Sequence, residues 1–245
     1  MNKRLIIIMS VVLLVTVFLV TRFFGVDNKK QNEKKTKSPD VMTLEEDKDR
    51  VVIVLDAGHG GRDPGKVGVA GQLEKDINLQ IVMKLKEALE NDTEINAKVV
   101  LTRSDDMGHY KEGTVNKKSE DMKKRCEIIE EAEPDLVVSI HQNSYHSSSV
   151  KGAQVFYYEK SEKGKVLANK IQTQLVASLS DGNKGRVEKA NDNYYLIMNV
   201  KSPAVIVECG FLSNEEEAKL LEDAEYQNKL TKAIVDGIRD YLKEY

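Results

Sequence analysis

Four polar side chains with the chemistry of a hydrolytic metal site follow apolar segments at widely separated places in this sequence. His59 lies in a glycine-rich loop after the apolar run 51–55, and Glu74 follows fifteen residues later. His141 and Glu208 each stand at the end of a further apolar run. Imidazole and carboxylate groups are common zinc ligands, and catalytic zinc sites use three protein ligands and keep one position open. These residue types therefore predict a zinc hydrolase.

The spacing of these residues does not by itself establish a metal site. His59 and Glu74 match no general zinc signature, and a carboxylate in the first turn of a helix also stabilises the helix dipole without a metal. Two other histidines, His109 and His146, lie in polar segments away from strand ends, and we expect both to be solvated rather than to bind metal. The hypothesis needs a fold that brings the candidate groups together.

Six glycines between positions 58 and 71 raise a second interpretation, a loop that cradles phosphate. The sequence contains no G-x-x-x-x-G-K-[ST] motif, and Gly58-x-Gly60 is followed by Asp63 where a dinucleotide-binding loop needs a third glycine. A turn-rich loop that lets the backbone approach a metal and a substrate accounts for these glycines better.

The apolar pattern along the chain predicts strands that alternate with helices. Apolar residues spaced by four predict helices over 74–91, 116–133, 161–179 and 226–242. Runs of β-branched and other apolar residues predict strands over 51–55, 98–103, 135–140, 153–158 and 204–207. We expect a loop or lid over 105–118, whereas NYYLIMNV (193–200) is ambiguous between strand and loop.

This alternation is typical of an α/β three-layer sandwich with a largely parallel central sheet flanked by helices. The strands that precede His59, His141 and Glu208 should lie side by side in such a sheet. Their carboxyl ends would then meet at one edge, where open α/β sheets place their sites.

Residues 1–26 differ in composition from the rest of the chain. Leu5–Thr21 is uncharged and would extend about 25 Å as a helix, somewhat less than a hydrocarbon core of roughly 30 Å. The run has no polar face that a surface helix would need, and it ends without an A-x-A cleavage site. We expect a retained membrane anchor rather than a cleaved signal, then a charged linker over 27–50 and an extracytoplasmic catalytic domain over 51–245.

Charge and cysteine content exclude two broad classes of protein. Setting aside the basic and acidic residues of 1–50 leaves 27 basic and 33 acidic residues, which argues against a nucleic-acid partner. Cys126 and Cys209 are too few for a disulfide framework. One lies on an apolar helix stripe and the other at a strand end, so we expect two buried free thiols rather than a bridge.

Four motifs resemble those of the zinc-dependent N-acetylmuramoyl-L-alanine amidases of bacterial cell walls (amidase type 3). They occur in the family's order and cover essentially all of 51–245: LDAGHGG (55–61), EKDINL (74–79), SIHQN (139–143) and VECGFLSN (207–214). The resemblance implies that one Zn²⁺ is bound by His59, Glu74 and His141, and that Glu208 is the catalytic carboxylate. Cys209 departs from the aliphatic or small residue usual there, which should alter packing rather than ligation.

The resemblance also implies the reaction, hydrolysis of the amide bond between the lactyl group of N-acetylmuramic acid and L-alanine in peptidoglycan. Zinc would activate water and polarise the carbonyl group, and Glu208 would act as general base. Two neighbouring residues each admit two roles. Asn143 could contact substrate or cap a loop, and Asp56 could orient a metal ligand or start the turn.

Within the family, the chain is most similar to the germination-specific amidases of spore-forming bacteria. The similarity lies in the absence of wall-binding repeats, in GAQVFYYEK (152–160) and in the Tyr-Tyr-Leu segment (194–196). It implies formation of muramic-δ-lactam in the spore cortex, in the forespore or spore envelope. A vegetative cell-wall autolysin, a zinc exopeptidase and a wall-binding protein with a relict site are the alternatives. The sequence leaves open whether the protein forms a homodimer or needs an accessory protein.

Overall fold

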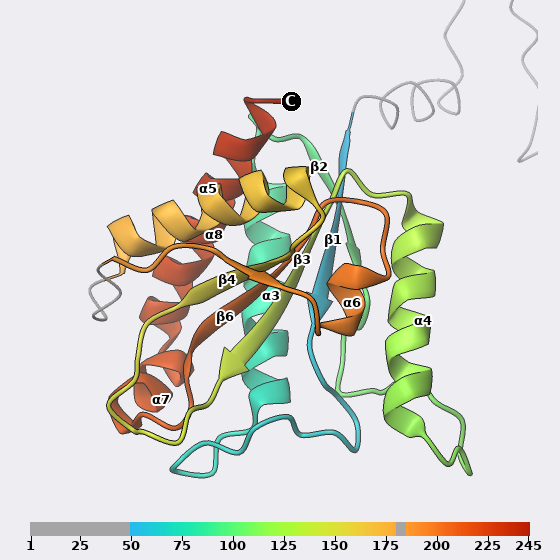
Figure 1. The fold of residues 1–245 in the computed structure, drawn as a ribbon, viewed down its shortest axis with the longest axis vertical. Coiled ribbons are helices and arrows are strands. Elements are labelled where there is room, and N and C mark those ends of the chain that lie inside the picture. Colours follow the sequence, from blue (N-terminus) through green and yellow to red (C-terminus); the bar gives the residue numbers. More distant parts are fainter. Residues whose placement is uncertain (1–49, 180–184) are drawn as a thin grey trace, which may run out of the picture. The chain divides into compact units, whose positions relative to one another are not determined.

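The computed structural model describes residues 50–179 and 185–245, and six strands form one sheet within these ranges (Figure 1). The strands are β1 (Val51–Ala57), β2 (Ala97–Leu101), β3 (Leu136–Asn143), β4 (Gln154–Tyr158), β5 (Lys189–Asn191) and β6 (Ala204–Phe211). Their spatial order is β2-β1-β3-β6-β4-β5. The first four strands in this order are parallel, and β4 runs antiparallel to β6. The prediction of a largely parallel sheet is confirmed.

Helices cover both faces of this sheet (Figure 1). The described helices are α3 (Glu74–Glu90), α4 (Lys117–Ala132), α5 (Glu162–Ser178), α6 (Tyr195–Met198), α7 (Glu215–Glu222) and α8 (Ala224–Leu242). Helices α3, α5 and α8 pack on one face through the larger apolar cluster, and α4 and α6 pack on the other face through a smaller one. The arrangement is the predicted three-layer sandwich.

The two apolar clusters explain the unbroken apolar runs of the central strands. Ile53 and Leu55 of β1 enter the larger cluster, and Val54 between them enters the smaller one. A strand buried on both faces has no need of polar residues at alternate positions. Helix α3 buries one face only, and it does so through the predicted stripe of apolar residues at 77, 81, 85 and 89.

Strands β3 and β6 are longer than the sequence pattern predicts. The apolar runs end at Ile140 and Val207, but His141 and Glu208 continue the strands because they pair directly with each other across the parallel ladder. The two polar residues therefore lie within regular structure rather than in the loops that follow it. This placement gives both side chains the rigidity of a central strand pair.

The ambiguous segment NYYLIMNV forms the short helix α6 and not a strand or a loop. The side chain of Asn191 accepts hydrogen bonds from the backbone N–H groups of Asn193 and Tyr194, which turns the chain. Leu196 and Ile197 are then buried in the smaller apolar cluster. Helix α7 was not predicted either, although Asn214, the residue before it, caps the helix by accepting a hydrogen bond from the backbone N–H of Glu217.

The chain divides into two units, Met1–Leu44 and Glu45–Tyr245, and the described residues belong to the second unit. The predicted anchor at 1–26 and the linker up to residue 49 lie outside the described residues. Within the described ranges, no helix combines the length and the apolar content needed to span a membrane.

Helices α5 and α8 pack so closely that only glycine fits at one contact, and this generates a test of the packing. A Cβ atom at Gly237 would lie 2.5 Å from the Cα atom of Ile171. We expect Gly237→Ala to lower the free energy of unfolding by about 1–3 kcal/mol, because overpacking outweighs the better helix propensity of alanine. Urea denaturation measures this, with Asn228→Ala at an exposed position of α8 as control. An unchanged midpoint for Gly237→Ala would contradict the packing described.

Candidate functional site

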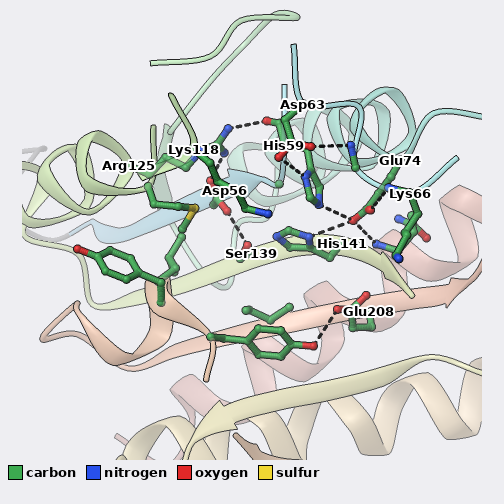
Figure 2. A pocket seen from close by; sticks show the side chains of 18 of the residues that line it. Asp56, His59, Asp63, Lys66, Glu74, Lys118, Arg125, Ser139, His141 and Glu208 are labelled. Atoms are coloured by element: carbon green, nitrogen blue, oxygen red, sulfur yellow. Dashed lines mark hydrogen bonds and ion pairs between the residues drawn. The ribbon is translucent and has the colours of Figure 1, made fainter. Parts of the chain in front are cut away.

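Three of the predicted site residues meet at the carboxyl ends of β1 and β3 (Figure 2). The Nε2 atom of His59 lies 3.1 Å from Oε1 of Glu74, and Nδ1 of His141 lies 3.0 Å from the same oxygen. One potential ligand atom from each residue lies within 4.8 Å of the others. His59 comes from the loop after β1, Glu74 is the first residue of α3, and His141 belongs to β3. The fold thus brings together side chains that are far apart in the sequence.

The loop after β1 permits this approach because it contains glycine at the point of contact. A Cβ atom at Gly58 would lie 2.2 Å from Cε1 of His141, so a larger residue would displace the imidazole ring. The next residue, His59, has a φ of 64°, a left-handed conformation that is uncommon for a residue with a side chain. The surrounding hydrogen bonds must therefore hold this backbone in place.

Glu74 is the central group of the cluster and is held in an ionised form. Its Oε1 also accepts a hydrogen bond from the backbone N–H of Gln142 at 3.1 Å, and its Oε2 accepts one from the N–H of Lys66 at 2.7 Å. Burial alone would raise the pKa of Glu74, but the hydrogen bonds with His141 and His59 lower the pKa well below its usual range. The carboxylate therefore carries its charge at neutral pH.

Asp63 fixes the orientation of His59, a role that the sequence reasoning missed. Its Oδ2 lies 2.9 Å from Nδ1 of His59, which leaves Nε2 facing Glu74. Its Oδ1 accepts a hydrogen bond from the backbone N–H of Gly65 at 3.0 Å. Burial lowers the pKa of His59, but the two carboxylates raise it on balance. The sequence did contain a signal for this role, an acidic residue four positions after a candidate metal-binding histidine.

The donor set fits a divalent cation such as zinc. Two imidazole nitrogens and one carboxylate oxygen are typical of catalytic zinc sites with three protein ligands. A carboxylate on the second ring nitrogen, as Asp63 provides for His59, is the usual outer partner of a metal-binding histidine. In the described part of the chain, the cluster of His59, Glu74 and His141 is the one group of such residues close enough to hold an ion.

Glu208 lies beside this cluster, across the ladder from His141 in β6. It is 7% exposed, and it lines a pocket of about 620 Å³ together with the three clustered residues. The hydroxyl group of Tyr194 donates a hydrogen bond to Oε1 at 3.3 Å, whereas Oε2 has no hydrogen-bond partner among the described residues. Burial raises the pKa of Glu208, and the nearby charge of Glu74 adds to this effect. The carboxylate is therefore suited to accept and hold a proton.

Asp56 acts through an arginine and makes no hydrogen bond with the clustered side chains. Its carboxylate accepts hydrogen bonds from Nη1 of Arg125 at 2.6 Å and from the hydroxyl groups of Thr102 and Ser139. Arg125 in turn donates to the backbone carbonyl groups of Ala57, at 2.7 Å, and His59. Of the two predicted roles, the structure favours support of a site residue, since the arginine carries the connection to the backbone of His59.

Arg103 is a second arginine that holds the same loop. It donates hydrogen bonds to the carbonyl groups of Ala57 at 2.8 Å and Gly58 at 3.1 Å, and to that of Lys75 at the start of α3. The sequence reasoning missed both arginines. Arg125 could have been noticed in the sequence, because this charged residue lies next to the apolar face of its helix.

The remaining sequence expectations have mixed outcomes. The side chain of Asn143 accepts a hydrogen bond from the N–H of Ser144 at 2.8 Å, which is the loop-capping role. His146 is exposed as expected, but the expectation of a solvated ring is wrong for His109. That ring is half-buried because its Nε2 lies 2.7 Å from the carbonyl oxygen of Thr102. Both cysteines are buried and free, as predicted.

The fold and the site together define a class. An α/β domain that carries a His-Glu-His cluster and a buried carboxylate at the carboxyl ends of parallel strands has the architecture of a metal-dependent hydrolase. Residues 53–240 match the family described as N-acetylmuramoyl-L-alanine amidase, and the chain belongs to this family. It is a peptidoglycan amidase, which removes the zinc exopeptidase and the non-enzymatic alternatives.

Individual relatives agree with this assignment. The germination-specific N-acetylmuramoyl-L-alanine amidase of Bacillus subtilis (strain 168) is 39% identical over 196 residues, which cover 79% of this chain and 80% of that relative. The CwlD amidase from Clostridioides difficile, solved in complex with the GerS lipoprotein, is 42% identical to this chain, with a TM-score of 0.76. The match covers 80% of this chain and 100% of the CwlD chain. The solved catalytic domain of CwlV from Bacillus (Paenibacillus) polymyxa var. colistinus is 33% identical, with a TM-score of 0.67. The match covers 79% of this chain and 98% of that structure.

The buried pair of Asp56 and Arg125 makes a prediction about stability. We expect Arg125→Met to lower the free energy of unfolding by about 3–5 kcal/mol, because it leaves a buried carboxylate without its counter-ion. The double variant Asp56→Asn/Arg125→Met should lose less free energy of unfolding than Arg125→Met alone, because no unpaired charge is then left buried. Urea denaturation of both, with Arg62→Met at an exposed position as control, measures the difference.

The same pair predicts how this difference depends on pH. Burial opposes ionisation, but Arg125 and the two hydroxyl groups hold the pKa of Asp56 well below its usual range. A lowered folded-state pKa stabilises the protein above about pH 4, and the contribution disappears as the pH falls toward the folded-state value. The gap between wild type and Arg125→Met should therefore narrow on acidification. A gap that is constant from neutral to acidic pH would contradict this account.

Proposed function

We propose that this chain is a zinc-dependent N-acetylmuramoyl-L-alanine amidase that modifies the spore cortex. The observation that supports zinc most directly is the convergence of ligand atoms from His59, Glu74 and His141 within 4.8 Å. The proposed catalytic domain is 51–245, preceded by a signal or membrane anchor at 1–26 and a charged linker at 27–50.

In this proposal His59, Glu74 and His141 would hold one zinc ion, each through one ligand atom. When bound, zinc would supply Lewis acidity that activates water and polarises the scissile carbonyl group. Asp63 keeps the ring of His59 in the orientation that ligation needs, through the contact at Nδ1. The lowered pKa of Glu74 keeps that ligand anionic at neutral pH.

Glu208 is the proposed general base. It lines the same pocket, and its Oε2 atom is buried without a hydrogen-bond partner among the described residues, so a water molecule bound in the pocket would satisfy this oxygen. The carboxylate would take a proton from the attacking water and return it to the nitrogen of L-alanine as the amide C–N bond breaks. Burial raises the pKa of Glu208, which makes it a better proton acceptor than an exposed carboxylate. The products are the lactyl carboxylate and a free amino group on L-alanine.

The spore-cortex role is supported by similarity to the germination-specific amidase of Bacillus subtilis at 39% identity. We propose that the chain removes peptides from muramic acid so that muramic-δ-lactam can form, outside the cytoplasm in the forespore or spore envelope. The CwlD amidase was solved in complex with the GerS lipoprotein, so we also propose an accessory lipoprotein as partner.

Two substitutions separate the proposed ligands from the proposed base. We expect Glu208→Ala to keep its zinc and to lose about 10²–10⁴-fold in turnover, the range that general acid–base catalysis contributes. His59→Ala should lose both zinc and activity, because it removes a ligand. Metal analysis and hydrolysis of a defined muropeptide measure the two properties, with His146→Ala at an exposed position as control. Full activity in Glu208→Ala would refute the proposed mechanism.

Product analysis tests the biological role. Zinc-loaded enzyme and defined muropeptides should yield free lactyl groups together with peptides that begin at L-alanine. Spores of a strain that lacks this protein should contain cortex without muramic-δ-lactam, whereas cell separation during growth should be normal. A normal cortex together with defective cell separation would instead identify a vegetative autolysin.

A further inference from the structure

Within the described residues, the carboxylate of Glu208 has one hydrogen-bond donor, the hydroxyl group of Tyr194. The donor lies 3.3 Å from Oε1, and Oε2 has no partner among these residues. A buried carboxylate usually accepts several hydrogen bonds, because desolvation of the charged group is costly. The two oxygens of Glu208 therefore differ, since Tyr194 holds Oε1 and the buried Oε2 still lacks a donor.

Tyr194 is well placed to act as a fixed donor. Its backbone N–H donates to the side chain of Asn191 at 3.0 Å. Its ring packs edge-on against Phe156, with centroids 5.5 Å apart and an interplanar angle of 80°. The residues that follow are anchored, since Leu196 and Ile197 are buried in the smaller apolar cluster. The hydroxyl group thus reaches Glu208 from a segment that is immobilised on both sides.

The protonation state of Tyr194 supports the direction of this hydrogen bond. Burial raises the pKa of Tyr194 above its usual value, and the charge of Glu208 adds to the shift. The phenol group therefore stays protonated at every pH at which an amidase would be assayed. It can donate to the carboxylate but cannot compete with it as a base.

An alternative role for Tyr194 is direct hydrogen bonding to substrate, since the residue also lines the pocket. The observed contact favours Glu208, because the hydroxyl group is engaged by Oε1. The distance of 3.3 Å is long for an O–H···O bond, but catalytic hydrogen bonds are often long before substrate is bound.

We propose that Tyr194 is the positioning residue for Glu208: it holds Oε1, which leaves the unpartnered Oε2 to accept the proton of the reacting water. This inference rests on the proposed function, in which Glu208 is the general base. It assigns a role to the short helix α6 and the residue before it, which lie outside the four motifs that identify the family. The site is then completed from the turn between β5 and α6 as well as from the central strands.

Tyr194→Phe tests the proposal, because it removes only the hydroxyl group and preserves the ring packing. We expect kcat to fall about 10-fold, the effect of losing one hydrogen bond to a charged group, with KM and zinc content unchanged. The matched control is Tyr158→Phe, which makes the same change at a residue of the same apolar cluster that does not line the pocket. It should leave kcat at the wild-type value. A wild-type kcat in Tyr194→Phe, or a raised KM with unchanged kcat, would overturn the proposal.

A double variant distinguishes positioning of Glu208 from a direct effect on substrate. If Tyr194 acts through Glu208, Tyr194→Phe in a Glu208→Gln background should cause no further loss, whereas multiplied losses would overturn the proposal. High activity of Glu208→Gln alone would refute the proposed base itself, so the two failures can be told apart.

A crystal structure of metal-free Tyr194→Phe provides a readout that does not depend on activity or on stability. The Glu208 carboxylate should rotate or occupy two conformers, because its only described donor is gone. A carboxylate that keeps its wild-type position would overturn the proposal even if the variant is less stable.

Discussion

The site depends on one buried ion pair at the end of the first strand, between Asp56 and Arg125. Both side chains are almost fully buried, so their desolvation must be offset by hydrogen bonds to every remaining polar atom. Two hydroxyl groups donate hydrogen bonds to the carboxylate of Asp56. The guanidinium group of Arg125 also donates hydrogen bonds to Asp121 and to two backbone carbonyl groups. One of these carbonyl groups belongs to His59, whose positive φ would otherwise relax. A stability element of the core thereby sets the geometry of the surface loop that bears a candidate ligand.

Two carboxylates a short distance apart are given opposite properties by their surroundings. Glu74 is surrounded by two imidazole rings and two backbone N–H groups, and these lower its pKa in spite of burial. Glu208 has a single long hydrogen bond among the described residues, so burial dominates and raises its pKa. Pairs of acids whose environments separate their pKa values are a general way to divide roles in an active site. Here the division matches the proposed roles, metal ligation by Glu74 and proton transfer by Glu208.

Much of the fold could be predicted from the sequence because its strands are buried on both faces. The runs before His59, His141 and Glu208 are continuous and apolar, and parallel sheets place such strands side by side. The apolar pattern of the sequence was less informative for short segments that are only partly buried. Helix α6 is too short to show a period, and a side-chain turn at Asn191 decides its start. The polar ends of β3 and β6 were missed because pairing between strands, rather than hydrophobicity, extends them.

Side-chain chemistry and spacing along the chain were enough to predict the order of the long helices and central strands and the residue types at the site, because these are local properties. The groups that support those residues become visible only in the folded domain. Arg125 reaches Asp56 across 69 positions of sequence, and Tyr194 reaches Glu208 across 14. Contacts of this kind leave no period and no motif in the chain, since they arise when separate elements pack against one sheet. Their energies come from burial, which exists only once the core has formed.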